Sequence, residues 1–522
     1  MPASFLDKSN NKHMRQESKR VYASDTVSES YDVVVIGSGI GGLTAALYLA
    51  KAGKRVLVLE KHYVPGGYCS SFWKKGYYFD AAAHVLSSCR PSGQLGRLLS
   101  DHDLSTRMEF IRCNPSDVMI TRNARVFIKI DYEELVQEFQ TAFPREAKEI
   151  RKLLDYMSRT DPLRLYADLK DKTFSDLLDS YLKSTELKSQ LSIQLGNIGL
   201  PSSQASAVTA VFLYREFVFD GGYYPKGGMQ AFPDLLVARL REYGGHMAFL
   251  SQATSIHFEA NKVSHVVIRT SGKKIERVRT PLVIMNGDPV QLFGTLLRGT
   301  LLADRVRPLL ESLTPSMSSI MMHIAVREDI RGTCEYSCNV WHFGGKHVDD
   351  YYGAVCAGDV ALDHDFAFFS IPTLHDRSIL PEGKHSIQCI LGAPFKPREF
   401  WEQEGLKEQI EERIVRRAER YIPGLRKSID FCAIATPPTL YKFTGNFQGA
   451  MYGWASSRDQ LGRYSGLAEG LSEVGLHLVG HWAGLPTGTN GVATVVASGR
   501  SLSRKLLNRS RQSSIRSTIL TS

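Results

Sequence analysis

Near its N-terminus the chain carries a complete nucleotide-binding βαβ unit, which constrains the fold more than any other segment. The apolar run 33–36 predicts a buried parallel strand, and it leads directly into the glycine turn 37–42, GSGIGG. Apolar residues at helical spacing follow until Gly53, and a second apolar run, 55–59, ends at Glu60. A glycine fingerprint in this context of strand, helix and terminal acid predicts a dinucleotide site.

The glycines of this turn have separate expected roles. Gly37 permits the tight turn, Gly39 lets backbone N–H groups approach a pyrophosphate, and Gly42 lets the helix pack closely on the strand. The helix N-terminus favours the negative charge of the phosphates. We expect Glu60 to accept a hydrogen bond from an adenosine ribose hydroxyl.

The composition is that of a large soluble enzyme. The 522 residues, 43% of them hydrophobic, can bury a substantial core. No stretch approaches the roughly 20 consecutive apolar residues of a spanning helix, and residues 1–30 lack the apolar core of a signal peptide. The eight cysteines show no CxxC spacing. We therefore expect a cytoplasmic protein with reduced thiols.

Secondary-structure signals beyond the βαβ unit separate a helical region from regions of sheet. Residues from about 130 to 220 are rich in helical periodicity and charge, which predicts a helical insertion. Segments 253–256 and 263–268 predict a hairpin, and 283–286 predicts another buried strand. Alternation after Leu313 predicts a further strand in a mixed-sheet domain that continues to about residue 455.

The last part of the chain returns to the nucleotide. A strand at 476–480 ends at a glycine, and a helix opens at 489–492 and runs to about Leu507. The N-terminus of such a helix can stabilise negative charge on a flavin pyrimidine ring.

Several motifs together resemble those of one enzyme family. They are PGGY at 65–68, YPKGG at 224–228, GNFQGAMYGW at 445–454 and GLHLVG at 475–480, in addition to the glycine turn and Glu60. With them the chain resembles the FAD-dependent phytoene dehydrogenase-related family, which includes carotenoid desaturases, carotenoid cis–trans isomerases and retinol saturases. The resemblance extends from Tyr31 to about Leu507 and implies FAD as cofactor.

The resemblance also implies an α/β fold in which a Rossmann-type FAD-binding domain is assembled from discontinuous segments. We assign residues 31–90, 225–305 and 460–507 to this domain. Residues 91–224 and 306–459 form the mixed-sheet substrate domain that contains the helical insertion. A disordered tail at 1–30 and a basic tail at 508–522 complete the expected organisation.

The cofactor-binding residues are assigned from the fingerprint and from the motifs of the resemblance. They are Gly37, Gly39, Gly41, Gly42, Glu60, Lys61, Gly66, Gly67, Tyr68, Ala253, Gly480, His481, Asn490, Gly491 and Val492. His481 departs from the family pattern, which usually has Asp after the glycine of the closing strand. An imidazole can still donate a hydrogen bond to a phosphate, so we keep His481 as a neighbour of the cofactor.

Three residues are candidates for the catalytic wall. His84 follows the strand that ends at Phe79-Asp80, where related flavoproteins approach the isoalloxazine ring. The alternative is that His84 has a purely structural role. Tyr452 and Trp454 could stack along a long apolar substrate or could be core aromatics. The spacing of His342 and His347 fits no helical ligand pair, so we expect no metal site.

The predicted reaction passes a hydride between the flavin and an apolar polyene or isoprenoid held in a tunnel. Desaturation, saturation and redox-neutral isomerisation remain open. No second GxGxxG fingerprint is present, which disfavours direct NADPH turnover and predicts an external electron acceptor or donor. Two alternatives are a flavin amine oxidase and a non-catalytic binding protein like the GDP-dissociation inhibitors.

Six basic residues from Arg500 onward have no acidic counterpart in the sequence. Such a tail could lie on an anionic membrane surface or remain solvated. The basic residues are not interleaved with aromatics in a nucleic-acid module, so we expect no nucleic-acid partner. The chain is therefore expected to be soluble and able to associate peripherally with a membrane.

Overall fold

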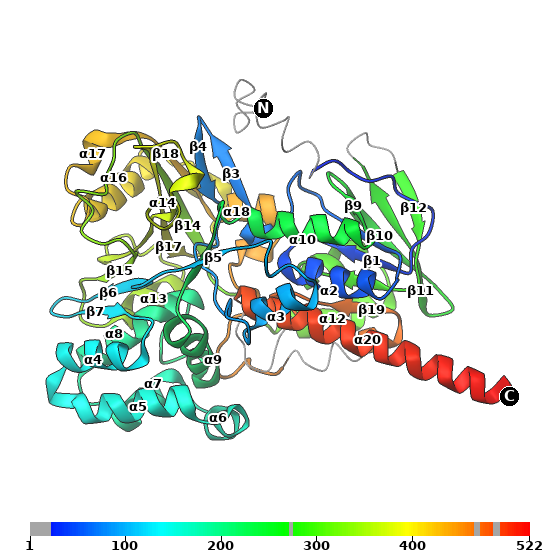
Figure 1. Cartoon of the computed structure of the whole chain (residues 1–522), viewed down its shortest axis with the longest axis horizontal. Coiled ribbons are helices and arrows are strands. Elements are labelled where there is room, and N and C mark those ends of the chain that lie inside the picture. The colour runs from blue at the N-terminus through cyan, green and yellow to red at the C-terminus, as the bar shows by residue number, and fades with distance from the viewer. Residues whose placement is uncertain (1–21, 271–274, 464–469, 484–490, 522) are drawn as a thin grey trace.

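A five-stranded parallel sheet forms the centre of the nucleotide-binding half, which lies on the right of Figure 1. The structure is a computed structural model that describes residues 22–270, 275–463, 470–483 and 491–521, with side chains described up to Arg509. The strands, in sheet order, are β19 (Leu476–Leu478), β13 (Val283–Met285), β1 (Val33–Ile36), β2 (Val56–Leu59) and β9 (His246–Ala248). Because they come from distant parts of the sequence, this half of the molecule is discontinuous, as expected.

Helices and a small sheet cover the parallel sheet. The helices of this half are α2 (Ile40–Lys51), α3 (Gln94–Asp101), α10 (Ala231–Glu242), α11 (Pro289–Gln291), α12 (Leu301–Glu311) and α20 (Val492–Thr521). The predicted hairpin is confirmed as β10 (Gln252–Glu259) and β11 (Lys262–Arg269), which β12 (Ile275–Arg279) extends to an antiparallel sheet. Apolar residues of both sheets share one core cluster.

A seven-stranded mixed sheet forms the second half of the molecule. Its strands, in sheet order, are β18 (Ile429–Ala435), β14 (Ser318–Val326), β17 (His385–Ala393), β16 (Phe366–Ser370), β15 (Asn339–Phe343), β6 (Asp117–Ile120) and β7 (Arg125–Ile128). All neighbours are antiparallel except β15 and β6, which run parallel. This confirms the mixed sheet and the strand predicted after Leu313. Every residue of β14 is buried, which makes it a central strand.

The helical insertion is confirmed and lies at the lower left of Figure 1. It comprises α4 (Tyr132–Ala142), α5 (Ala147–Arg159), α6 (Pro162–Leu169), α7 (Phe174–Tyr181), α8 (Thr185–Ser192) and α9 (Ala207–Leu213). Side chains cap several of these helices; Thr173 and Asp176, for example, form a capping box at the start of α7. A π-helical segment, Tyr214–Phe219, continues α9 toward the centre of the molecule.

The remaining elements connect the two halves or cover the mixed sheet. The strands β3 (Ser71–Lys74) and β4 (Tyr77–Asp80) form a hairpin, and β5 (Phe110–Arg112) pairs antiparallel with β8 (Tyr223–Pro225), which is distant in sequence. The helices are α13 (Val348–Cys356), α14 (Pro372–His375), α15 (Arg398–Trp401), α16 (Leu406–Ala418), α17 (Leu425–Ser428) and α18 (Pro437–Thr444). In the part of the chain that the structure describes, no helix is both long enough and apolar enough to cross a bilayer.

The expected tails need correction. Residues 22–30 are not a disordered tail: the Asp25 N–H donates to the Met247 carbonyl at 2.8 Å, and the Asp25 carboxylate pairs with Arg241 at 3.0 Å. These bonds join the segment to β9 and α10. The last helix does not end near Leu507 but continues as α20 to Thr521, because neither glycine nor proline follows Gly499 to interrupt it. Figure 1 shows this helix projecting from the body.

The expected domain boundary at residue 91 also needs correction. Leu95, Leu98 and Leu99 of α3 are buried in the same core cluster as α2, and Arg500 of α20 forms an ion pair with Asp101 at 3.2 Å. Residues 94–113 therefore pack with the nucleotide-binding half. The periodicity of α3 predicts an amphipathic helix but carries no information about which half of the molecule receives its apolar face.

Candidate functional site

The glycine turn forms a tight cradle at the carboxyl end of β1. Gly37 has a φ of 99°, a conformation that favours glycine. A Cβ atom at Gly39 would lie 2.7 Å from the side-chain nitrogen of Asn286, and one at Gly41 would lie 2.9 Å from the Cα of Gly480. A side chain at Gly39 would therefore displace the Asn286 side chain, and one at Gly41 would push against the backbone that follows β19. The close packing leaves the backbone of the turn open to a pyrophosphate.

Gly42 supports the cradle without facing a ligand. It does not line the cavity described below. A Cβ at this position would lie 2.4 Å from the Gly37 carbonyl oxygen. Glycine therefore lets α2 start directly against the turn, which is the close packing expected of the third fingerprint glycine.

Glu60 connects the cradle to the end of β2. Its Oε2 accepts hydrogen bonds from the Ser38 N–H at 2.9 Å and the Ser38 hydroxyl at 2.6 Å, and its Oε1 accepts from the His62 N–H at 2.8 Å. The side chain is buried but lines the cavity. Because carboxylate oxygens accept more than one hydrogen bond each, Glu60 can order the turn and still receive a ribose hydroxyl.

A cavity of about 750 Å³ joins the cradle to the mixed sheet. Its wall contains residues of both halves, including His323 of β14 and Leu440 of α18. The predicted site residues that line it are Gly37, Gly39, Gly41, Glu60, Lys61, Gly66, Gly67, Tyr68, His84, Ala253, Tyr452, Gly480, His481, Gly491 and Val492. Asn490 lies outside the described residues.

Three histidines face this cavity in the neutral state. Burial lowers the pKa of His84, His323 and His481 to about 4. Among the described residues, His84 Nδ1 and His481 Nε2 have no hydrogen-bond partner. Buried polar atoms of this kind are usually satisfied, so these two nitrogens fit a polar ligand in the cavity. Together with the cradle, they suit a dinucleotide that carries a ring with polar edges.

The GNFQGAMYGW motif closes the cavity on the side of the mixed sheet. The Trp482 indole N–H donates to Asn446 at 2.9 Å, and the Phe447 N–H donates to the Asp288 carboxylate. The Tyr68 hydroxyl donates to the Ala450 carbonyl at 2.9 Å. Residues of the nucleotide-binding half therefore hold the motif in place. The motif forms part of the interface between the two halves.

The two aromatic candidates in this motif have different positions. Tyr452 lines the cavity, its hydroxyl donates to the Gly196 carbonyl at 3.0 Å, and burial raises its pKa. Trp454 does not line the cavity. It packs edge-to-face on Trp482 with ring centroids 4.9 Å apart, within a small apolar cluster. The assignment of Trp454 to the catalytic wall is therefore wrong. Tyr452 faces the cavity, whereas Trp454, two residues later in the loop, packs against Trp482.

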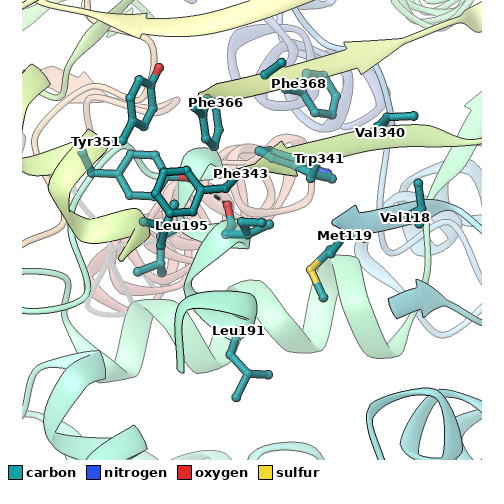
Figure 2. Close-up of a cluster of buried hydrophobic side chains, with 14 of the residues drawn as sticks. Val118, Met119, Leu191, Leu195, Val340, Trp341, Phe343, Tyr351, Phe366 and Phe368 are labelled. Carbon is teal, nitrogen blue, oxygen red and sulfur yellow. Dashed lines mark hydrogen bonds between the residues drawn. The ribbon is translucent and has the colours of Figure 1, made fainter. Parts of the chain in front are cut away.

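A small aromatic chamber lies beyond Tyr452. It encloses about 30 Å³ and shares His84, Ile390 and Tyr452 with the wall of the larger cavity. Trp341 and Phe368 have ring centroids 4.3 Å apart, and Tyr351 stacks on Phe366 at 4.2 Å. Figure 2 shows these four side chains in the aromatic cluster beside β15 and β16. We call this space the inner chamber.

The histidine and aspartate side chains near residue 345 form hydrogen bonds and ion pairs with other residues of the protein. His342 interacts with the Tyr421 hydroxyl at 2.6 Å and with Asp365 at 3.1 Å, and Asp349 accepts hydrogen bonds from Ser202. Within the described ranges, no three His, Cys, Asp or Glu side chains are arranged to hold a metal ion.

Sequence reasoning missed Asn286, Glu216 and His323. Asn286 donates through Nδ2 to the Gly37 carbonyl at 3.3 Å, and its position as the last residue of the predicted strand 283–286 was an available signal. Glu216 lines the cavity from the π-helical segment and stands with Arg215 in an otherwise apolar run. His323 sits in a central strand, and only the tertiary structure places it on the cavity wall.

Comparison with known proteins is consistent with this geometry. The family described as flavin containing amine oxidoreductase matches residues 40–339. Prolycopene isomerase from Arabidopsis thaliana is 26% identical over 461 residues, which cover 80% of this chain and 73% of that protein. Human all-trans-retinol 13,14-reductase is 23% identical over 484 residues, which cover 83% of this chain and 79% of that protein.

Solved structures share the fold. An oxidoreductase from Methanosarcina mazei has a TM-score of 0.64 at 17% identity, covering 90% of this chain and 99% of the other. Putrescine oxidase bound to putrescine has a TM-score of 0.62 at 16% identity, covering 92% and 99%. At these identities the likeness concerns the fold alone.

Proposed function

Since this chain belongs to the flavin-containing amine oxidoreductase family and is an FAD-dependent oxidoreductase, we propose that it transforms an apolar polyene or isoprenoid, such as a carotenoid. The transformation is a desaturation, a saturation or a cis–trans isomerisation. The similarity to a prolycopene isomerase and to a retinol 13,14-reductase supports a conjugated apolar substrate.

The inner chamber carries this proposal. Its described wall contains Trp341, Tyr351, Tyr352, Phe366 and Phe368 and no Asp, Glu, Lys or Arg side chain. An ammonium group would be costly to bury there because no carboxylate compensates for its lost hydration. At about 30 Å³ the chamber admits only the end of an apolar chain whose length lies in the larger cavity, and that end gains favourable burial against the aromatic rings.

The residues of the chain hold the reactants. The backbone around Gly39 binds the pyrophosphate, Glu60 accepts from the ribose, and the first turn of α20 favours negative charge on the ring. FAD supplies the hydride acceptor and donor when it is bound. Tyr452, His84 and Ile390 stand where the cavity meets the inner chamber, so they orient an apolar chain that extends from the flavin.

Two other functions fit the same architecture less well. An amine oxidase is supported by the family and by the fold of putrescine oxidase, and the larger cavity contains the acids Glu60 and Glu216; the inner chamber, however, offers a cationic substrate no countercharge. A binding protein without cofactor would not need the open cradle at Gly39 or a buried acid at Glu60.

Product analysis tests the proposal. The purified holoenzyme is incubated with cis-polyenes, with and without a quinone as electron acceptor, and the products are separated by chromatography. Conversion in the absence of acceptor indicates isomerisation, and conversion that requires the acceptor indicates desaturation. A Gly39→Val variant, which cannot accept the pyrophosphate, is the inactive control. Turnover of amines with no change in any polyene would contradict the proposal.

The proposed enzyme also needs an external electron acceptor or donor, and we propose that it binds to an anionic membrane. Tyr63, Trp73 and Phe443 line the cavity and are also exposed, with exposed fractions of 42%, 43% and 44%, so we take them as the mouth of the cavity. Lys74 and Lys442 stand beside them in the cavity wall. Aromatic rings and lysines combine apolar insertion with attraction to anionic lipid, and a substrate dissolved in a bilayer would enter directly through this mouth.

Cosedimentation with anionic liposomes tests the membrane proposal. Trp73→Ser and Phe443→Ser should each weaken binding, whereas Leu163→Ser should not. Leu163 is 81% exposed but lies on α6, in the helical insertion and not at the mouth. Equal loss of binding in all three variants would show that the mouth has no special role.

A further inference from the structure

Glu216 is a carboxyl group in the cavity wall that has no role in the proposal above. It belongs to the π-helical segment Tyr214–Phe219, a type of helix that occurs frequently at functional sites. Its neighbour Phe217 also lines the cavity. The segment packs on the start of α20, because a Cβ at Gly491 would lie 3.4 Å from the Phe217 ring and 3.8 Å from Glu216 Oε2.

The carboxyl group is incompletely satisfied within the protein. Its Oε2 is buried and has no hydrogen-bond partner among the described residues, while Thr494 in the first turn of α20 is within hydrogen-bonding reach of the side chain. Asp220, one turn further along, is in contrast fully engaged: it pairs with Arg90 and accepts from the Ser88 N–H at 2.7 Å. Glu216 is thus the acid of this region that remains available to the cavity.

Few charged groups lie near Glu216. Asp220 and Arg90 act on it with opposite signs, and Arg215 on its own segment is directed away, to the Met157 carbonyl at 2.7 Å. The sequence from residue 483 to residue 499, which includes the first turn of α20, contains no charged side chain. His84 and His481 are the other titratable cavity residues on the adjoining loops, and both are neutral. Burial dominates this balance and raises the pKa of Glu216 to about 7.

We propose that Glu216 is the proton-exchanging group of the flavin site, taking up one proton when a hydride reduces the flavin and releasing it when the flavin is reoxidised. The hydride carries two electrons and one proton from a substrate C–H bond to the flavin, which gains one negative charge, and the oxidised substrate releases a second proton to solvent. The Glu216 carboxylate combines with a proton from solvent to become the neutral acid, which restores the net charge. Reoxidation passes the two electrons to an external acceptor and releases two protons to solvent, the one that the hydride carried and the one held by Glu216.

The position of Glu216 explains why reduction of the flavin favours its protonation. The first turn of α20 favours negative charge on the adjoining cavity, and two nearby anions in a poorly solvated wall repel each other. Reduction of the flavin therefore raises the proton affinity of Glu216 further. The inference rests on the flavin of the proposed enzyme but not on its polyene substrate, so its test needs no substrate turnover.

The test is a potentiometric titration of the bound flavin in the holoenzyme as a function of pH. For a two-electron couple, each proton taken up adds about 30 mV per pH unit to the slope of the midpoint potential. In the wild type the slope should therefore steepen by about 30 mV per pH unit above a pH near 7, where oxidised Glu216 is ionised and reduced Glu216 is neutral. In Glu216→Gln this steepening should be absent.

Two controls make the result decisive. Glu109→Gln removes an acid that is 62% exposed and paired with Lys226, and it should keep the wild-type slope. A redox difference infrared spectrum should show a protonated carboxyl band on reduction of the wild type and not of Glu216→Gln. A wild-type slope that never steepens overturns the inference even if the Gln variant loses its flavin, and so does equal steepening in both proteins. Absence of polyene conversion would instead contradict the proposed substrate alone.

Discussion

Replacement of Glu60 by Gln isolates the contribution of one buried carboxylate to both folding and cofactor retention. Glu60 is 9% exposed and accepts three hydrogen bonds from the protein. A Gln carbonyl oxygen can still accept the two bonds from Ser38, but its amide NH₂ group then faces the His62 N–H, and two donors meet. The loss of one hydrogen bond to a charged acceptor costs about 1.5–3 kcal/mol in the free energy of unfolding of the apoprotein.

Cofactor affinity should fall by a comparable amount, because the ribose hydroxyl then donates to a neutral oxygen or meets an amide N–H. A loss of about 1.5–3 kcal/mol corresponds to roughly 10- to 150-fold weaker FAD binding. Urea denaturation of the apoprotein measures the first effect, and fluorescence titration with FAD measures the second. Ser38→Ala is the matched control: it removes only the hydroxyl contact at 2.6 Å, so it should cost about 1.5–3 kcal/mol in stability, like any hydrogen bond to a charged group, and leave ribose binding intact. Unchanged FAD affinity in Glu60→Gln, with unchanged stability, would refute the assigned role.

Further predictions follow from the cradle, the C-terminal helix and the buried histidines. Gly39→Val should abolish FAD binding, because the Cβ alone would lie 2.7 Å from Asn286 and the side chain would occupy the path of the pyrophosphate; a wild-type flavin spectrum in this variant would contradict the cradle. Truncation after Leu507 removes Arg509, Arg511 and Arg516 and should weaken cosedimentation with anionic liposomes at low salt while the flavin spectrum is retained; undiminished binding would leave the tail without a docking role. The folded-state pKa values of His84, His323 and His481 are about 4, below the value of 6.5 for an unfolded histidine, so their stabilising contribution is present above about pH 6.5 and is lost as the pH falls toward 4. Urea denaturation across this interval should show the decline, and His481→Gln should flatten part of it; an identical pH profile in that variant would show that the imidazole is not buried as a neutral group.

The nucleotide-binding unit could be predicted from the sequence because its determinants are local. The strand at 33–36, the glycine turn and Glu60 follow one another along the chain, and each has a periodicity or a residue type that only a few conformations satisfy. The helical insertion and the alternating strands were predicted for the same reason. Most of the predicted cofactor residues also meet at one cavity, since motifs of this kind mark strand ends that a parallel sheet brings together.

Only the tertiary structure decided which side chains share a wall. Trp454 packs on Trp482 instead of facing the cavity, and α3 joins the nucleotide-binding half, because the destination of an apolar face depends on partners that are distant in sequence. Asn286, His323 and Glu216 reach the site from three separate elements, and no local pattern marks them as neighbours. The properties that make Glu216 chemically interesting, its burial and its unpartnered oxygen, exist only after the π-helical segment has packed against the start of α20. Local chemistry along the chain thus specified the cofactor cradle, and long-range packing determined the electrostatics of the site.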